Sequence, residues 1–140
     1  MKRSVIFDVA LRGLAPILSL LALFLLVSAH NAPGGGFVSG LVVAGLFSLF
    51  YVAQGRAGLM RIQFVRPVLL VGVGFGVAVI SGIVPVFFGG DLLGQEIFTV
   101  AIPFFGQVKF PTSLVFDTGI LLVVAGSVNE ALLALTSRGP

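Results

Sequence analysis

The residues of this chain that could carry chemistry are few, and they stand apart from one another in long apolar stretches. The sequence has five Asp and Glu residues and one histidine in 140 positions, and it has no cysteine. Asp117 and Glu130 both fall in the last apolar run, and His30 falls in a short glycine-rich segment. Ionisable side chains in or beside membrane spans are typical of ion and proton pathways, because a buried charge is costly. These three residues are therefore the candidates for an ion pathway.

The two carboxylates of the last run are too far apart to form one proton path by themselves. Thirteen residues separate Asp117 from Glu130, which is about 20 Å along a helix, and they point to different faces at about 100° per residue. Asp117 also has a structural interpretation, since the dipole favours a carboxylate in the first turns of a helix capped by Thr112 or Ser113. Glu130 opposes the dipole near the helix end, unless it reaches the membrane surface or pairs with Arg138. Both interpretations stay open for each carboxylate.

The sequence contains no set of residues typical of an enzyme. It has no Ser-His-Asp combination, no metal-binding cluster and no carboxylate pair with catalytic spacing. The net charge of +3 comes from Lys and Arg at the ends of the apolar runs, not from a basic stripe, which argues against nucleic-acid binding. We therefore expect neither an enzyme nor a cofactor, metal or nucleic-acid binding protein.

The composition predicts that lipid is the solvent of this chain. Hydrophobic residues make up 58% of the sequence and charged residues 9%, whereas about 25% of residues are charged in a soluble domain. A helix needs about 20 residues to cross the hydrocarbon core. We predict an all-α integral membrane protein, one domain over residues 1–140. Its four transmembrane helices are expected at about residues 12–29, 36–53, 67–88 and 113–135.

Basic residues alternate between the connections and predict the orientation of the helices. They lie before the first run, between the second and third, and after the last: Lys2, Arg3 and Arg12; Arg56, Arg61 and Arg66; Arg138. The connection between the first two runs has none, and the third connection has only Lys109. Because cytoplasmic loops are rich in Lys and Arg, we expect both termini in the cytoplasm. Asp8, four residues before Arg12, is expected to pair with it.

Two connections are expected to carry local structure. The apolar segment between the third and fourth runs is too short and too broken by proline and glycine to span. It is expected to form a small external hairpin, with Gly106 and Gln107 in the turn, or an interfacial segment. The connection 54–66 is expected to hold a short interfacial helix.

Small residues recur at gaps of four in the second and third runs. Gly36 and Gly40 form one such pair, Gly72 and Gly76 another, and Gly74, Ala78 and Gly82 continue a third. This spacing places them on one helix face, where a neighbouring backbone can approach closely. Four helices offer more of this surface than one bundle needs, so we expect the chain to be a subunit of a larger assembly.

One motif resembles a known family. The run His30-Asn31-Ala32-Pro33-Gly34-Gly35-Gly36-Phe37-Val38-Ser39-Gly40-Leu41-Val42 resembles the hallmark of the MnhB/MrpB family. Phe116-Asp117-Thr118-Gly119-Ile120 resembles that family's F-D-x-G stretch. The proline blocks helix before it and the glycines allow positive φ, so the motif fits a rigid external turn that seats a partner or lines an aqueous entrance. A histidine in such a turn also has a purely local role open to it, through hydrogen bonds near Asn31.

The resemblance implies a small, non-enzymatic subunit of the Mrp-type multi-subunit Na⁺/H⁺ antiporter in a prokaryotic cytoplasmic membrane. The partners it implies are large complex-I-like subunits and other small membrane subunits, with Na⁺ and H⁺ as the transported ions. No role is carried onto Glu130 by this resemblance. Two alternatives stay open: a subunit of the ion-translocating module of a membrane-bound hydrogenase-type complex, and a purely structural packing subunit.

Overall fold

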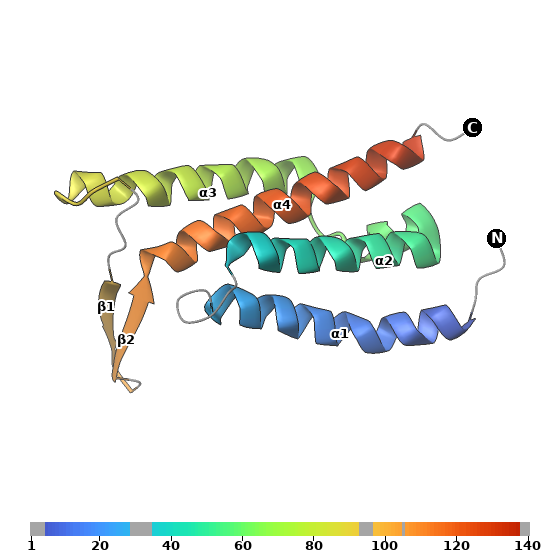
Figure 1. Ribbon diagram of the computed structural model, residues 1–140, viewed down its shortest axis with the longest axis horizontal. Helices are drawn as coiled ribbons and strands as arrows, with labels where there is room; N and C mark the ends of the chain where they lie inside the picture. Colours follow the sequence, from blue (N-terminus) through green and yellow to red (C-terminus); the bar gives the residue numbers. More distant parts are fainter. Residues whose placement is uncertain (1–4, 29–34, 93–96, 105, 138–140) are drawn as a thin grey trace.

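Four long helices and one β-hairpin make up the described part of the chain. The computed structural model describes residues 5–28, 35–92, 97–104 and 106–137. Its helices are α1 (Val5–Val27), α2 (Gly36–Ile62), α3 (Pro67–Phe87) and α4 (Thr112–Ser137) (Figure 1). Each is long and apolar enough to cross a membrane. The predicted all-α membrane architecture with four spans is therefore confirmed, whereas the orientation of the termini stays a prediction.

Two helices extend beyond the apolar runs that predict them. α1 begins at Val5 and not near residue 12, and α2 continues to Ile62 and not to about residue 53. α2 is kinked at Gly55, whose φ of 65° is a left-handed conformation that suits glycine. The helical turns after this kink fall in the connection for which a short helix is expected. Apolar runs mark only the part of a helix that can lie in lipid, so they underestimate its polar ends.

A polar contact joins the ends of α1 and α2. The Gln54 side-chain Nε2 donates a hydrogen bond to Asp8 Oδ1 over 3.1 Å. No ion pair forms between Asp8 and Arg12, so the predicted local pair is wrong. An exposed pair four residues apart contributes only about 0.3–0.5 kcal/mol, whereas a hydrogen bond to a charged group contributes about 1.5–3 kcal/mol. The part-buried contact between helices therefore prevails.

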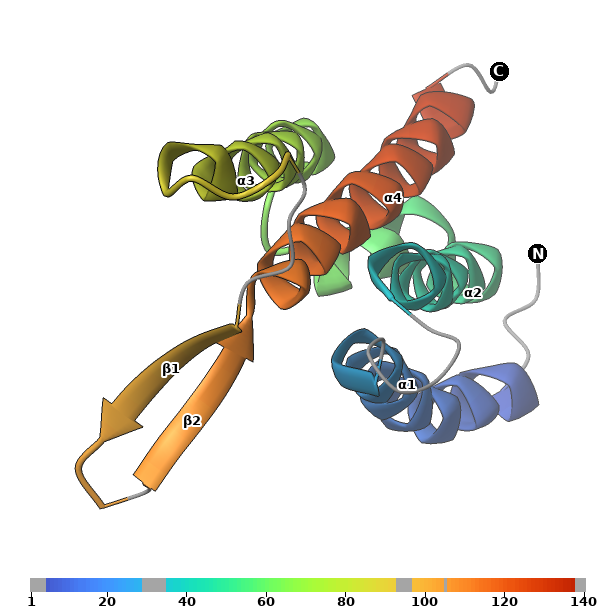
Figure 2. The ribbon, with the colours of Figure 1, turned by 60° about the vertical axis from the view of Figure 1, so that its left-hand side comes forward.

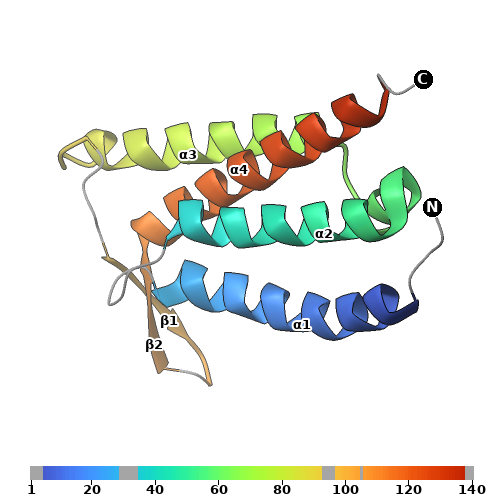
Figure 3. The same ribbon diagram turned by 45° about the vertical axis from the view of Figure 1, so that its right-hand side comes forward.

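The helices form an open row in the order α3, α4, α2, α1 (Figures 1 and 3). α4 packs against α3 on one side and α2 on the other, and α1 packs mainly against α2. Only 17–22% of the residues in each apolar helix window are buried inside the chain. Most of the apolar surface must therefore meet lipid or other proteins.

The hairpin predicted between the third and fourth spans is present. β1 (Ile97–Ile102) pairs antiparallel with β2 (Gly106–Pro111), and β2 runs directly into α4. The hairpin projects from the same end of the helices as the first residues of α4 (Figure 2). Its turn lies at residues 103–105, since Ile102 pairs with Gly106, and the predicted turn at Gly106 and Gln107 is wrong. Gly106 has a φ of 77°, which is typical of the glycine that closes a three-residue hairpin loop.

Candidate functional site

The start of α2 lies directly against the first turns of α4. A Cβ atom added at Gly36 would overlap the backbone carbonyl of Asp117, and one at Gly40 would lie 2.9 Å from Val124 Cβ. Both glycines are buried, whereas Phe37 from the same motif is 59% exposed. Glycine is therefore required at these two positions so that the helices can approach to backbone contact.

Asp117 lies at the N-terminal ends of two helices at once. It is half-buried in the second turn of α4, and its backbone touches Gly36, the first residue of α2. Gly35 caps α2 without a side-chain hydrogen bond. The contact is made by the Asp117 backbone, and the carboxylate belongs to the second turn of α4, beyond the first turn in which a helix dipole acts most strongly. The structure thus gives the Asp117 backbone a packing role.

Only the second half of the glycine-rich motif belongs to the described residues. His30, Asn31, Pro33 and Gly34 lie outside them. Gly35 has a φ of 111° and its N–H donates a 3.2 Å hydrogen bond to the Leu25 carbonyl of α1. The motif therefore contains, directly before α2, a glycine whose backbone links α2 back to α1.

α3 and α4 also meet through glycine. A Cβ atom at Gly74 would lie 2.6 Å from the Gly119 carbonyl oxygen, and one at Gly119 would lie 2.7 Å from the Gly74 carbonyl oxygen. Gly72 and Gly76 have nothing within 4 Å of an added Cβ. The row of Gly74, Ala78 and Gly82 is buried. Of the two stripes on α3, one therefore packs inside the chain and the other points outward.

Glu130 lies in a shallow groove between α3 and α4. The groove has a volume of about 390 Å³ and is lined by Val68, Val71, Ser127, Glu130, Ala131 and Ala134. The Ser127 hydroxyl donates its hydrogen bond to the Val123 carbonyl over 2.7 Å. Glu130 is exposed, and no hydrogen bond or ion pair holds its carboxylate in the described part of the chain. Arg138, the partner considered for it, lies outside that part.

The N-terminus of α3 lies beside this carboxylate. Gly126 packs against the carbonyl of Pro67, the first residue of α3, and Glu130 lies about one turn beyond this level along α4. The positive end of the α3 dipole offsets the unfavourable dipole of α4 itself. Arg56 and Arg61 at the end of α2 and Arg66 in the connection to α3 are exposed.

The structure does not bring the ion-pathway candidates together. Asp117 touches the start of α2, whereas Glu130 lies in the groove beside the start of α3. The start of α2 and the start of α3 lie near opposite ends of α4, about 20 Å apart along its axis. In this chain alone the two residues belong to different sites.

Sequence analysis missed Asn129, which precedes Glu130. Its side chain is completely buried, and neither Oδ1 nor Nδ2 has a hydrogen-bond partner within the described residues. A buried amide without partners costs about 1–3 kcal/mol in proteins. The signal that could have found it is a lone amide in a span that is otherwise almost entirely apolar.

Replacing this amide is expected to stabilise the protein. Asn129→Leu removes two unpartnered polar atoms and keeps the branching and number of side-chain heavy atoms, so we expect a gain of up to about 1–3 kcal/mol, less the cost of leucine's larger volume. The gain would appear as a higher unfolding midpoint of the purified protein. Asn129→Asp, which adds a charge at the same place, is expected to lower the midpoint. A lower midpoint for Asn129→Leu would contradict the cost assigned to the buried amide.

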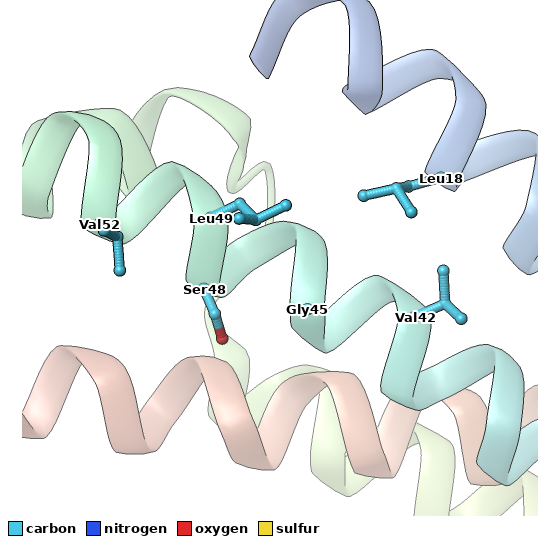
Figure 4. Close-up of a pocket in the computed structure, with 6 residues that line it drawn as sticks. All are labelled: Leu18, Val42, Gly45, Ser48, Leu49 and Val52. Atoms are coloured by element: carbon cyan, nitrogen blue, oxygen red, sulfur yellow. The ribbon is translucent and has the colours of Figure 1, made fainter. Parts of the chain in front are cut away.

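A second groove lies between α1 and α2, and none of its lining residues is ionisable. It has a volume of about 430 Å³ and is lined by Leu18, Val42, Gly45, Ser48, Leu49 and Val52. Figure 4 shows Leu18, Val42 and Leu49 pointing toward the space between the helices. The Ser48 hydroxyl donates to the Ala44 carbonyl over 2.9 Å. The surface is therefore apolar and suits a lipid chain or a helix better than an ion.

Comparison with known proteins gives one consistent family. Residues 6–129 match a family model described as a domain related to the MnhB subunit of Na⁺/H⁺ antiporter. A putative antiporter subunit mnhB2 of Staphylococcus aureus (strain Newman) is 31% identical over 92% of this chain and 94% of its own length. The Staphylococcus haemolyticus protein of the same name is 32% identical over the same shares. In the structure of the Mrp complex from Dietzia sp. DQ12-45-1b, one chain matches with a TM-score of 0.75 and 32% identity. That match covers 92% of this chain and 13% of the other.

Proposed function

Because this chain belongs to the family of domains related to the MnhB subunit of Na⁺/H⁺ antiporters, we propose that it is one membrane subunit of a multi-subunit Na⁺/H⁺ antiporter. The observation that carries the proposal is the open row of helices. A row with 17–22% of each apolar window buried leaves both faces uncovered, and small residues such as Gly72 and Gly76 stand open on it. Such faces suit close packing with other membrane subunits. The relative from Dietzia is part of an Mrp complex, which agrees with this role.

The chain itself is proposed to catalyse no covalent reaction. The family is one of antiporter subunits. In the part of the chain that the structure describes, no three His, Asp or Glu side chains gather around a common point. The role proposed for the chain is to hold neighbouring subunits in place and to line part of their ion route. Large complex-I-like subunits and other small membrane subunits of the antiporter are the proposed partners.

We propose the membrane from the family and the orientation from the charge pattern. We place the chain, as one domain over residues 1–140, in the cytoplasmic membrane of a prokaryote. Both termini and the α2–α3 end of the chain are proposed to face the cytoplasm, because Arg56, Arg61 and Arg66 are exposed there. The hairpin then lies on the outer surface, beside the starts of α2 and α4, where Gly36 contacts the backbone of Asp117.

The candidates for the ion route divide between these two surfaces. Asp117 belongs to the outer end of the helices, and Glu130 belongs to the cytoplasmic end. His30 lies outside the described residues, and the charge pattern predicts it in an external connection. The backbone of Asp117 is fixed against Gly36 at the start of α2, so we propose that this residue is structural. Glu130 has no partner in the described part of the chain, so it is the better candidate for a contact with another subunit or with the ion route.

The proposed function is tested by Na⁺-driven proton flux in inverted membrane vesicles. The complete set of antiporter subunits would be produced in a host that lacks its own antiporters, with and without this chain. We expect this chain to copurify with the other subunits and the flux to fall to background without it. Full flux and an intact complex in its absence would contradict the proposed role.

The two carboxylates are compared in the same vesicles. We expect Asp117→Asn to keep most of the flux, because an amide retains the size and the hydrogen-bond acceptor at a site fixed by backbone packing. A native gel would follow the assembly of the complex in parallel. Lost flux in a fully assembled Asp117→Asn complex would place this carboxylate in the ion route instead.

A further inference from the structure

We propose that the groove around Glu130 is a docking site for a Lys or Arg side chain of a neighbouring transmembrane subunit. The inference rests on the proposed function, since it names the chemistry of one partner within the same assembly. It concerns the α3–α4 surface lined by Val68, Val71, Ser127, Glu130, Ala131 and Ala134.

The charge of the groove is the first reason. Glu130 is exposed near the end of a mostly apolar helix, and the described part of the chain supplies no ion pair or hydrogen bond to it. Arg56, Arg61 and Arg66 are exposed and do not pair with it. Carboxylates in membrane helices almost always pair or face water, because an unpaired charge in hydrocarbon is costly. A cationic side chain from outside the chain meets this need.

The shape and the lining of the groove are the second reason. Apart from Glu130 and Ser127 it is formed by Val and Ala side chains, and its volume is about 390 Å³. Ser127 directs its hydroxyl to the Val123 carbonyl, so Glu130 is the one charged acceptor among the lining residues. Lys and Arg carry an apolar stem below their charge, and that stem packs on apolar surface while the head reaches a carboxylate. The groove offers both halves of this arrangement.

The small side chains at the rim are the third reason. Ala131 and Ala134 follow Glu130 on α4 and are both exposed, so a second helix can lie close to α4 at this level. Helix pairs in membranes are held by such close contacts together with polar pairs. The groove therefore receives a helix as well as its charged side chain.

The first test reverses the charge. Glu130→Lys and Glu130→Gln would be produced with the complete set of subunits and purified through a tag on another subunit. We expect Glu130→Lys to lower the copurification of the subunit that occupies the groove by at least about tenfold, because breaking a desolvated charge pair costs several kcal/mol. Glu130→Gln keeps an acceptor oxygen and is expected to lose less. Asp91→Lys makes a matched charge change at an exposed position outside the helices and is expected to assemble like the unsubstituted chain.

The second test captures the partner and does not depend on the folding of a charge variant. The chain has no cysteine, so Ala134→Cys provides a single thiol at the rim of the groove. In the intact complex, a short cross-linker that joins a thiol to an amine, or to a guanidinium group, should connect position 134 to a Lys or Arg of another subunit. Leu20→Cys, on an exposed face of α1, is the control and should not give this product.

The outcomes separate the two proposals. Normal assembly of Glu130→Lys, or cross-linking of position 134 to aminophospholipid headgroups alone, would overturn the docking site and leave the antiporter role intact. An unsubstituted chain that does not copurify with antiporter subunits would overturn both. A product with another subunit's Lys or Arg, lost in Glu130→Lys, supports the docking site.

Discussion

Gly36→Leu is expected to prevent α2 from packing on α4 and to remove the chain from the assembled complex. Even a single Cβ atom at this position overlaps the backbone carbonyl of Asp117, and a helix backbone cannot yield as a flexible side chain does. Overpacking of a well-packed contact costs about 1–3 kcal/mol and occasionally more. We expect a cost above this range, since two helices would have to separate. The amount of chain in the purified complex is the measurement.

Gly45→Leu is the matched control for this substitution. Gly45 lies in the same helix, and nothing is within 4 Å of an added Cβ there. We expect the chain to fold and insert normally, because leucine fits the apolar groove between α1 and α2 (Figure 4). If both variants assembled equally well, the contact between Gly36 and Asp117 would not hold the helices together. Loss of Gly45→Leu alone would place a partner in that groove.

Gly119→Val is expected to detach α3, with an effect of similar size. An added Cβ at Gly119 lies 2.7 Å from the Gly74 carbonyl oxygen and 2.8 Å from the Ala78 nitrogen, so backbone atoms would have to move. α4 is the helix against which α3 mainly packs in the row, and no second contact of comparable extent holds α3 in place. We expect faster cleavage by trypsin at the end of α2, after Arg56 and Arg61, together with a lower unfolding midpoint.

Gly76→Val is the control for Gly119→Val. Gly76 lies on α3 close to the contact with α4, but nothing is within 4 Å of an added Cβ. The isolated chain in detergent should therefore resist trypsin as well as the unsubstituted chain does. Equal cleavage of the two variants would show that the contact between Gly74 and Gly119 does not fix α3.

The sequence by itself determined the class of this protein and the number of its spans. Four apolar runs of sufficient length require four helices in lipid, because backbone groups in hydrocarbon must be satisfied within the segment. The segment before α4 was expected to form a hairpin or an interfacial segment, because residues 98–102 alternate weakly and turn-forming residues follow them. The predicted position of its turn was wrong. Both Pro103 and Gly106 are turn-forming residues, and only the pairing of Ile102 with Gly106 shows that the turn lies between these two residues.

Only the tertiary structure decided which surfaces are internal. The stripe of Gly72 and Gly76 and the stripe of Gly74, Ala78 and Gly82 both have gaps of four residues in α3. The first stripe has no neighbour within the described part of the chain, whereas the second packs on α4. Asn129 and Glu130 are neighbours in sequence, but one is completely buried and the other is exposed in a groove. The physical reason is that lipid chains and the contact surfaces between packed helices are equally apolar. Hydrophobicity therefore fixes that a helix spans the membrane, while backbone contact between particular glycines fixes which of its faces meets another helix.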